Sequence, residues 1–182
     1  IAYISIRGGV RGVKGVKFMQ MTVVLPYAVP GVIIALSMIL AFSQPIAGVR
    51  LYNTIWILLI AYIARFMNLG YNNISGAISQ VDTSLEEAAR ISGASQLRAF
   101  KDVMLPLLKS SLISSFFLVV APTISELSLS SLLWSVGNET IGTIVFSAKE
   151  EGRILLTAAI AIILIILVVF INLLVNSQTD KD

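Results

Sequence analysis

Four long apolar runs, separated by polar connections, dominate the pattern of this chain. Thr22 to Phe42 is 21 residues without a charged side chain, and a helix needs about 20 residues to cross a hydrocarbon core. Ile154 to Val175 is 22 residues with no ionisable group. Two shorter runs lie between them: Thr54 to Tyr71, which contains Arg65, and Leu107 to Pro122. The pattern predicts four membrane-spanning helices.

Two stretches depart from a regular helical pattern. Residues 123–151 have mixed polarity and could form a fifth, partly buried helix or a re-entrant hairpin; periodicity does not choose between them. In the first run, Pro26 and Pro30 each remove a backbone donor and clash with the preceding turn, so we expect the helix to kink there. The kink either suits the packing alone or flexes when a pathway opens.

The composition favours a chain that is solvated by lipid. Hydrophobic residues make up 57% of it and charged residues 13%, with a mean hydropathy of +0.90, whereas roughly a quarter of the residues of a soluble domain are charged. We therefore predict one all-α, polytopic membrane domain over residues 1–182. Residues 1–6 read like the end of a longer apolar helix, so we expect this domain to be incomplete at its N-terminus.

The chain contains no cysteine and no histidine. This excludes disulfides, thiol chemistry and imidazole catalysis, and it removes the usual zinc ligands. No catalytic residue and no metal site is predicted, which argues against a membrane enzyme. A formal net charge of +3 is too small to indicate nucleic-acid binding in so apolar a chain. A transporter, a passive channel and a structural membrane subunit remain as explanations.

Loop charge predicts the orientation of the chain. Four cations and no anion precede the first full run, namely Arg7, Arg11, Lys14 and Lys17. Positively charged loops stay in the cytoplasm. The chain should then cross outward at 22–42 and return at 54–71, which places a loop of about residues 72–106 in the cytoplasm.

This cytoplasmic loop carries signals for short helices. Thr83-x-x-Glu86 and Ser84-x-x-Glu87 both match the capping box, which predicts a helix start. Gly93 offers a stop or a sharp bend, after which a second short helix can begin at Ser95. The proline of Leu105-Pro106 suits the first turn of the next span.

The spacing within the loop resembles a known motif. Its parts are Glu87-Ala88-Ala89, then Gly93 after three residues, then Val103-Met104-Leu105-Pro106 after nine more. The sequence resembles the cytoplasmic EAA loop in the permease subunits of ABC-type importers. In that family the loop forms a short helix that docks into a groove of an ATP-hydrolysing subunit. The structural alternative is an ordinary amphipathic loop that lies on the membrane.

The resemblance implies a type I ABC importer permease core in a bacterial inner membrane, which the chain crosses several times. It implies that a partner uses the ATP, so this chain is not an enzyme and binds no cofactor. The implied partners are two ATPase subunits, a second permease half or subunit, an extracytoplasmic substrate-binding protein and the lipid bilayer.

Further segments resemble the ferric-iron branch of these permeases. They are Leu25-Pro26-x-x-Val29-Pro30-Gly31, Ala61-Tyr62-x-x-Arg65-Phe66, Glu126-Leu127-Ser128-x-Ser130-x-Leu132-Leu133, Gly137-Asn138-Glu139-Thr140 and Glu150-Glu151-Gly152. The resemblance therefore implies ferric iron as the substrate. Branches that move thiamine, aminoethylphosphonate, polyamines or sulfate share parts of the pattern and supply the alternatives.

Glu126 is a carboxylate within membrane-flanked sequence. Such groups are costly and usually face a cavity or a partner. With Ser128 and Arg65 it is a candidate for the translocation path of a cation. Alternatively, Glu126 caps a helix or forms an ion pair with Arg65.

Overall fold

The structure is a computed structural model that describes residues 1–10, 14–45 and 47–179 of the chain. Helices make up most of this part, which confirms the predicted all-α class. Their bounds are α1 Ala2–Val10, α2 Val16–Ala28, α3 Gly31–Phe42, α4 Ile55–Gln80, α5 Thr83–Ile91, α6 Gln96–Ala99, the π-helix η1 Phe100–Met104, α7 Leu105–Leu107, α8 Lys109–Ile124, α9 Ser130–Leu133, α10 Ile141–Glu150 and α11 Ile154–Thr179.

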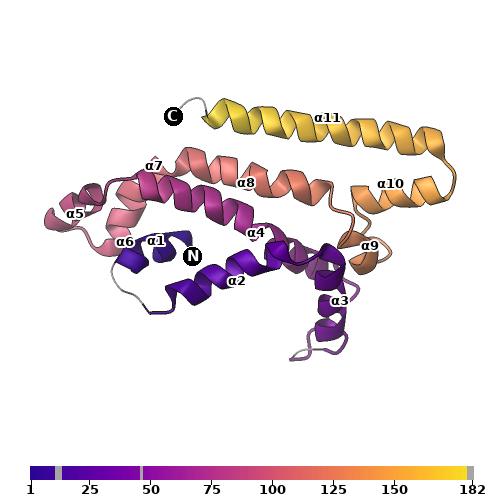
Figure 1. Ribbon diagram of the computed structural model, residues 1–182, viewed down its shortest axis with the longest axis horizontal. Coiled ribbons are helices and arrows are strands. Elements are labelled where there is room, and N and C mark those ends of the chain that lie inside the picture. The colour runs from indigo at the N-terminus through magenta and orange to yellow at the C-terminus, as the bar shows by residue number, and fades with distance from the viewer. Residues whose placement is uncertain (11–13, 46, 180–182) are drawn as a thin grey trace.

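The long helices form an elongated assembly built around α4 and α8. Helix α8 packs between α4 and α11, while α1 and α2 pack against α4. Helices α5 and α6 lie at one end of the molecule, and α9 and α10 lie at the other (Figure 1). Only 6% of the most apolar stretch of α11, within Ile154–Leu174, is buried. An apolar helix exposed in this way is suited to contact lipid.

Two of the four predicted spans are single helices that are long and apolar enough to cross a membrane. These are α4 and the Ile154–Leu174 part of α11. The other two runs fall on bent pairs of helices, so the described part of the chain has up to four spans if each pair is counted as one. The pairs are α2 with α3, bent by 113°, and Gln96–Leu107 with α8, bent by 70°.

The first apolar run is broken rather than kinked. Helix α2 continues past Pro26 to Ala28, so the helix does not end at Pro26. The break falls instead at Pro30, the residue before α3. A proline disfavours the helical conformation of the residue before it, and Val29 is extended, with φ −83° and ψ 134°. The chain therefore changes direction at this dipeptide.

The predicted boundaries around the loop need two corrections. Helix α4 extends to Gln80, so residues 72–80 are helical and the loop begins at Val81. The second short helix does begin after Ser95, but it continues through η1 into α7. Pro106 lies in the first turn of the short helix α7, before the 70° bend, and the long helix of the span starts at Lys109.

Residues 123–151 contain no single long helix. After the end of α8 they form α9, of four residues, and α10, of ten residues. Helix α10 packs against α9 and α11. The stretch therefore contains a partly buried helix, α10, but no single helix long enough to cross a membrane.

Candidate functional site

The described loop after α4, residues 81–106, is the candidate coupling segment. It begins with α5, whose N-cap is Asp82; the Asp82 carboxylate accepts a 2.8 Å hydrogen bond from the Ser84 amide. This and the Ser84 hydroxyl hold the pKa of Asp82 below its usual value. The helix start is where the sequence predicts it, but both predicted capping boxes are wrong, because Asp82 already supplies the capping oxygen.

Gly93 forms the bend between the two helices of the coupling segment. Its φ is +91°, a conformation that glycine adopts without the steric cost of a side chain. The amides of Gly93 and Ala94 donate 3.0 Å bonds to the carbonyls of Arg90 and Ala89, which is a Schellman motif. The Ser95 hydroxyl then accepts from the Arg98 amide and caps α6. The predicted bend is confirmed.

The outer face of the coupling segment exposes apolar side chains. Leu85, Ile91 and Leu97 are 46%, 88% and 77% exposed. Beside them lies a hollow of about 310 Å³, whose lining includes Ala89, Gly93, Ala94, Arg98, Asp102 and Val103. Glu87 and Ala88 are exposed on α5, and Leu105 and Pro106 are exposed at the end of the segment. Exposed apolar side chains around a hollow indicate a surface for a partner protein.

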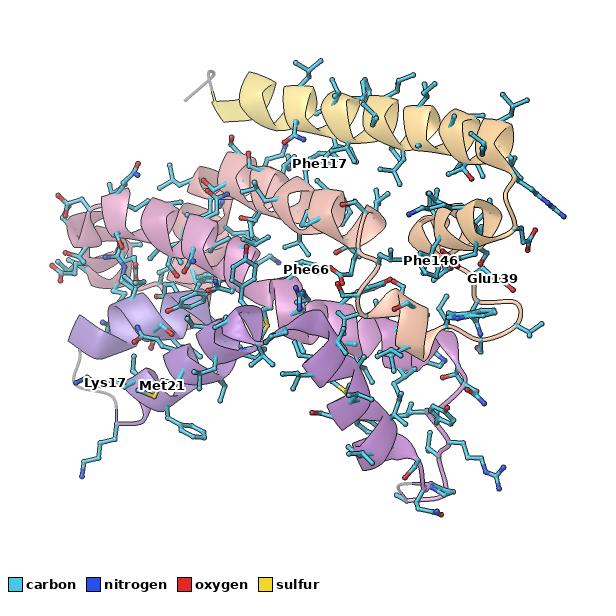
Figure 2. All side chains as sticks on the ribbon, turned by 45° about the vertical axis from the view of Figure 1, so that its right-hand side comes forward. Lys17, Met21, Phe66, Phe117, Glu139 and Phe146 are labelled. Atoms are coloured by element: carbon cyan, nitrogen blue, oxygen red, sulfur yellow. The ribbon has the colours of Figure 1, made fainter. Side chains whose placement is uncertain are left out.

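The inner face of α5 carries a contact that sequence reasoning missed. Arg7, which was predicted to lie in a cationic loop, belongs to α1 and forms a buried ion pair with Glu86. Arg11 lies outside the described residues. Lys14 and Lys17 are exposed, and Lys17 lies in the first turn of α2 (Figure 2). The ion pair joins residues 79 positions apart, and no local spacing signals it.

A second polar cluster lies where the break at Pro30 meets α4 and the end of α8. Arg65 Nε is 3.7 Å from Glu126 Oε2, and Arg65 Nη1 donates a 3.1 Å bond to the Val29 carbonyl. Glu126 Oε1 also accepts a 3.0 Å bond from the Leu129 amide, just before α9. Both structural contacts considered for Glu126, a helix cap and an arginine, are therefore present. Its place in a translocation path stays a prediction.

Glycine allows the close approach of chain segments in this cluster. A Cβ atom on Gly31 would lie 2.8 Å from Arg65 Nη1 and 2.9 Å from Ser128 Cβ. Ser130 donates a 2.8 Å bond to the Glu126 carbonyl and shares a hydrogen bond with the Tyr62 hydroxyl. Phe66, under the Arg65 guanidinium, lies in the interior of the assembly (Figure 2). The structure thus brings together Arg65, Glu126, Ser128 and the Pro30 break, as a packed junction.

A polar groove between α4 and α8 was not predicted. Its volume is about 420 Å³, and its polar lining residues are Asn72, Asn73, Gln80, Ser110, Ser111 and Ser114. The Asn73 amide donates to the Ser115 hydroxyl and the Ser111 carbonyl across the two helices. The sequence signal that could have found it is the helical spacing of amide side chains at 72, 73 and 80. The described residues contain no group of three or more acidic, histidine or cysteine side chains that could hold a metal ion.

Comparison with known proteins gives a consistent family. Residues 4–180 match the model of the binding-protein-dependent transport system inner membrane component. Permease protein PhnV of Salmonella typhi, provisionally named for 2-aminoethylphosphonate transport, is 30% identical over 85% of this chain and 58% of its own. The ferric transport system permease protein FbpB of Actinobacillus pleuropneumoniae is 28% identical over 95% of this chain and 24% of its own. The putrescine transport system permease protein PotI of Escherichia coli K12 is 29% identical over 80% of this chain and 51% of its own.

The chain therefore spans about a quarter to three fifths of the length of these relatives. A solved structure with a similar fold is a bacterial ABC transporter involved in the import of the acidic polysaccharide alginate. The similarity covers 99% of this chain and 71% of that chain, with a TM-score of 0.76 and 17% sequence identity.

Proposed function

We propose that this chain, which belongs to the family of binding-protein-dependent transport system inner membrane components, is a permease subunit of an ATP-driven ABC importer. It contributes spanning helices to a translocation path and docks an ATP-hydrolysing subunit at residues 81–106. The observation that carries the proposal is the coupling segment itself. Its apolar outer face is exposed, while its inner face is bonded to Arg7 of α1 and packs on Ile78 of α4 through Met104.

The proposed partners follow from this role. Two ATPase subunits dock at the cytoplasmic end, a second permease half completes the path, and an extracytoplasmic binding protein delivers the substrate. A similar fold occurs in an alginate ABC transporter in complex with a periplasmic protein. ATP is bound and hydrolysed by the partner, so this chain acts without a cofactor of its own in the bacterial inner membrane.

For the substrate we propose ferric iron, with 2-aminoethylphosphonate as the second candidate. A ferric transport system permease protein aligns with 95% of this chain. PhnV, provisionally named for the phosphonate, has slightly higher identity over 85%. The α4–α8 groove offers neutral amide and hydroxyl groups, which can hydrogen-bond the phosphonate or the water ligands of a hydrated ferric ion. Selectivity would then reside in the external binding protein.

Reconstitution tests the function directly. The chain is purified with the proteins that it retains and placed in vesicles, and uptake of ferric iron and of 2-aminoethylphosphonate is measured with and without ATP. The proposal predicts a co-purifying ATP-hydrolysing subunit and uptake that requires ATP. Uptake that is equal with and without ATP would indicate a passive channel. Uptake of 2-aminoethylphosphonate but not of ferric iron would show that the phosphonate, and not iron, is the substrate.

A further inference from the structure

A buried ion pair fastens helix α1 to the coupling segment. Arg7 Nε lies 2.8 Å from Glu86 Oε1, and the two side chains are only 8% and 4% exposed. Arg7 Nη2 donates a 2.6 Å bond to the Val81 carbonyl, and the Tyr3 hydroxyl donates a 2.7 Å bond to Glu86 Oε2. Arg7 thus bridges the end of α4 and the first turns of α5.

The burial of this pair is unusual for the coupling segment. The other ion pair described there, Arg98 with Asp102, is 75% and 58% exposed, and exposed pairs contribute little to stability. Burying two charges costs free energy that only good geometry and further hydrogen bonds offset. A buried pair is therefore weak evidence for stability alone, and fixing the orientation of an element is a role that such pairs can have.

Two neighbouring glutamates of α5 face opposite environments. Glu86 is 3% exposed and points to α1, whereas Glu87, the first residue of the Glu-Ala-Ala motif, is exposed. Adjacent residues of a helix point about 100° apart, which permits this division. One carboxylate is available to a partner, and the other holds the helix to its own chain.

Apolar packing extends the contact from α5 to the helices behind it. The Tyr3 ring meets the Phe100 ring edge-on, with centroids 4.8 Å apart. Tyr3 and Ile6 of α1 also pack on a buried cluster of Ile78, Met104 and Leu108. Helix α1 therefore contacts the end of α4, the start of α5 and η1.

We propose that Arg7 and Glu86 are positioning residues for energy coupling, which make α1 and the coupling segment one rigid body. A displacement of α5 by a docked ATPase would then move α1 as well as α4 and α8. The inference rests on the proposed function, because it assigns a transmission role to the inner face of the segment whose outer face binds the ATPase.

The first test measures the ratio of uptake to ATP hydrolysis in vesicles that contain the chain with the ATPase subunit it retains. Arg7→Met should lower this ratio about tenfold, within the usual range of coupling between sites, while ATP hydrolysis continues. Arg7→Lys should recover part of it, because an ammonium can pair with Glu86 but lacks the planar fork that also reaches Val81. Lys17→Met removes an exposed cation at the same end and should leave the ratio unchanged. An unchanged ratio in Arg7→Met would overturn the proposal.

The second test does not depend on how well Arg7→Met folds. The chain has no native cysteine, so Arg7→Cys with Glu86→Cys can be bridged by a reducible bifunctional thiol reagent of matching length. A rigid body predicts that bridging restores the ratio and that reduction lowers it again. If bridging stops uptake while ATP hydrolysis persists, α1 and α5 must move apart during transport and the proposal is wrong. If the wild-type chain shows no ATP-dependent uptake at all, it is the proposed function that fails.

Discussion

Arg65 and Glu126 join two interruptions of the helical framework. The guanidinium lies 3.7 Å from the carboxylate, and it also donates to the Val29 carbonyl at the Pro30 break. Glu126 in turn accepts from the Leu129 amide, where the chain leaves α8 and approaches α9. A charge placed among spanning helices needs a partner of this kind. The pair therefore holds the broken first run against the end of the third.

We expect Glu126→Gln to reduce the amount of assembled subunit in the membrane. The amide can still accept from Leu129, but it leaves the Arg65 charge without its counter-ion. Removing one partner of a buried pair costs about 3–5 kcal/mol, and we expect the low end here because the side chains are 19% and 11% exposed. Quantitative immunoblotting of membranes and thermal unfolding in detergent measure the effect.

The control for this change is Glu139→Gln, which alters an exposed carboxylate that accepts a bond from the Gly137 amide. The double variant Arg65→Gln with Glu126→Gln should recover assembly if the pair is structural. Normal assembly of the single variant with lost uptake would instead place Glu126 in the translocation path. Normal assembly with normal uptake would contradict both roles.

Gly31→Ala should destabilise the junction, although alanine is the better helix former. The added Cβ would lie 2.8 Å from Arg65 Nη1 and 2.9 Å from Ser128 Cβ, so one of these groups must move. Overpacking of this kind costs about 1–3 kcal/mol, which exceeds the gain of about 1 kcal/mol in helix propensity. The thermal unfolding temperature should therefore fall.

Gly76→Ala gives the matched control for Gly31. Gly76 is also helical, and a Cβ there would meet no atom within 4 Å. Only the gain in helix propensity remains, so the unfolding temperature should stay constant or rise slightly. A drop of equal size in both variants would mean that the close approach at Gly31 does not limit stability.

Gly93→Val should weaken the binding of the ATPase subunit. The bend has φ +91°, which costs a branched residue about 1–2 kcal/mol, so the two helices of the coupling segment should lose their relative orientation. The measurement is the amount of ATPase subunit retained during purification. Gly48→Val imposes the same backbone cost, since φ is +82° there, but it lies in the connection between α3 and α4. If the Gly93→Val and Gly48→Val chains retain equal amounts of the ATPase subunit, docking does not depend on the Gly93 bend.

Glu87→Lys should lower the affinity for the ATPase subunit without unfolding the chain. Glu87 is exposed in the second turn of α5, one residue past the first turn, where the interaction of its charge with the helix dipole is already weak. Reversing it changes the charge presented to the partner, which chiefly alters association rates and their salt dependence. Binding measured at low and high salt should differ more for wild type than for the variant. Glu150→Lys, an exposed change at the other end of the molecule, should bind like wild type.

Sequence reasoning located the helices where hydrophobic periodicity is strong and local. The apolar run from Ile154 to Val175 predicts a spanning helix without any knowledge of its tertiary contacts. Gly93 likewise predicts a bend from its residue type alone. The Pro30 break was foreseen as a kink, but its angle of 113° depends on what α3 packs against, which is a core shared with α4 and α9.

The two long-range ion pairs differ in whether the energetic cost of burying a charge points to them in the sequence. The Arg65–Glu126 pair was considered because two isolated charges near apolar spans each demand a partner. The Arg7–Glu86 pair was missed because each residue had a sufficient local explanation, as a loop cation and as part of a capping box. Asp82 displaced that capping box by lying one residue earlier, which freed Glu86 to turn inward. The groove between α4 and α8 needed the register of two helices that are distant in sequence.

Thiol labelling tests the predicted orientation without background, because the chain has no native cysteine. Single cysteines at Lys17 and Gln96 should resist an impermeant reagent in intact cells, whereas one at Gly48 should react. All three positions are exposed, so protection would report the membrane and not burial. In inverted vesicles the pattern should reverse. Labelling of Gln96 in intact cells would put the coupling segment outside and remove any route by which it could meet a cytoplasmic ATPase.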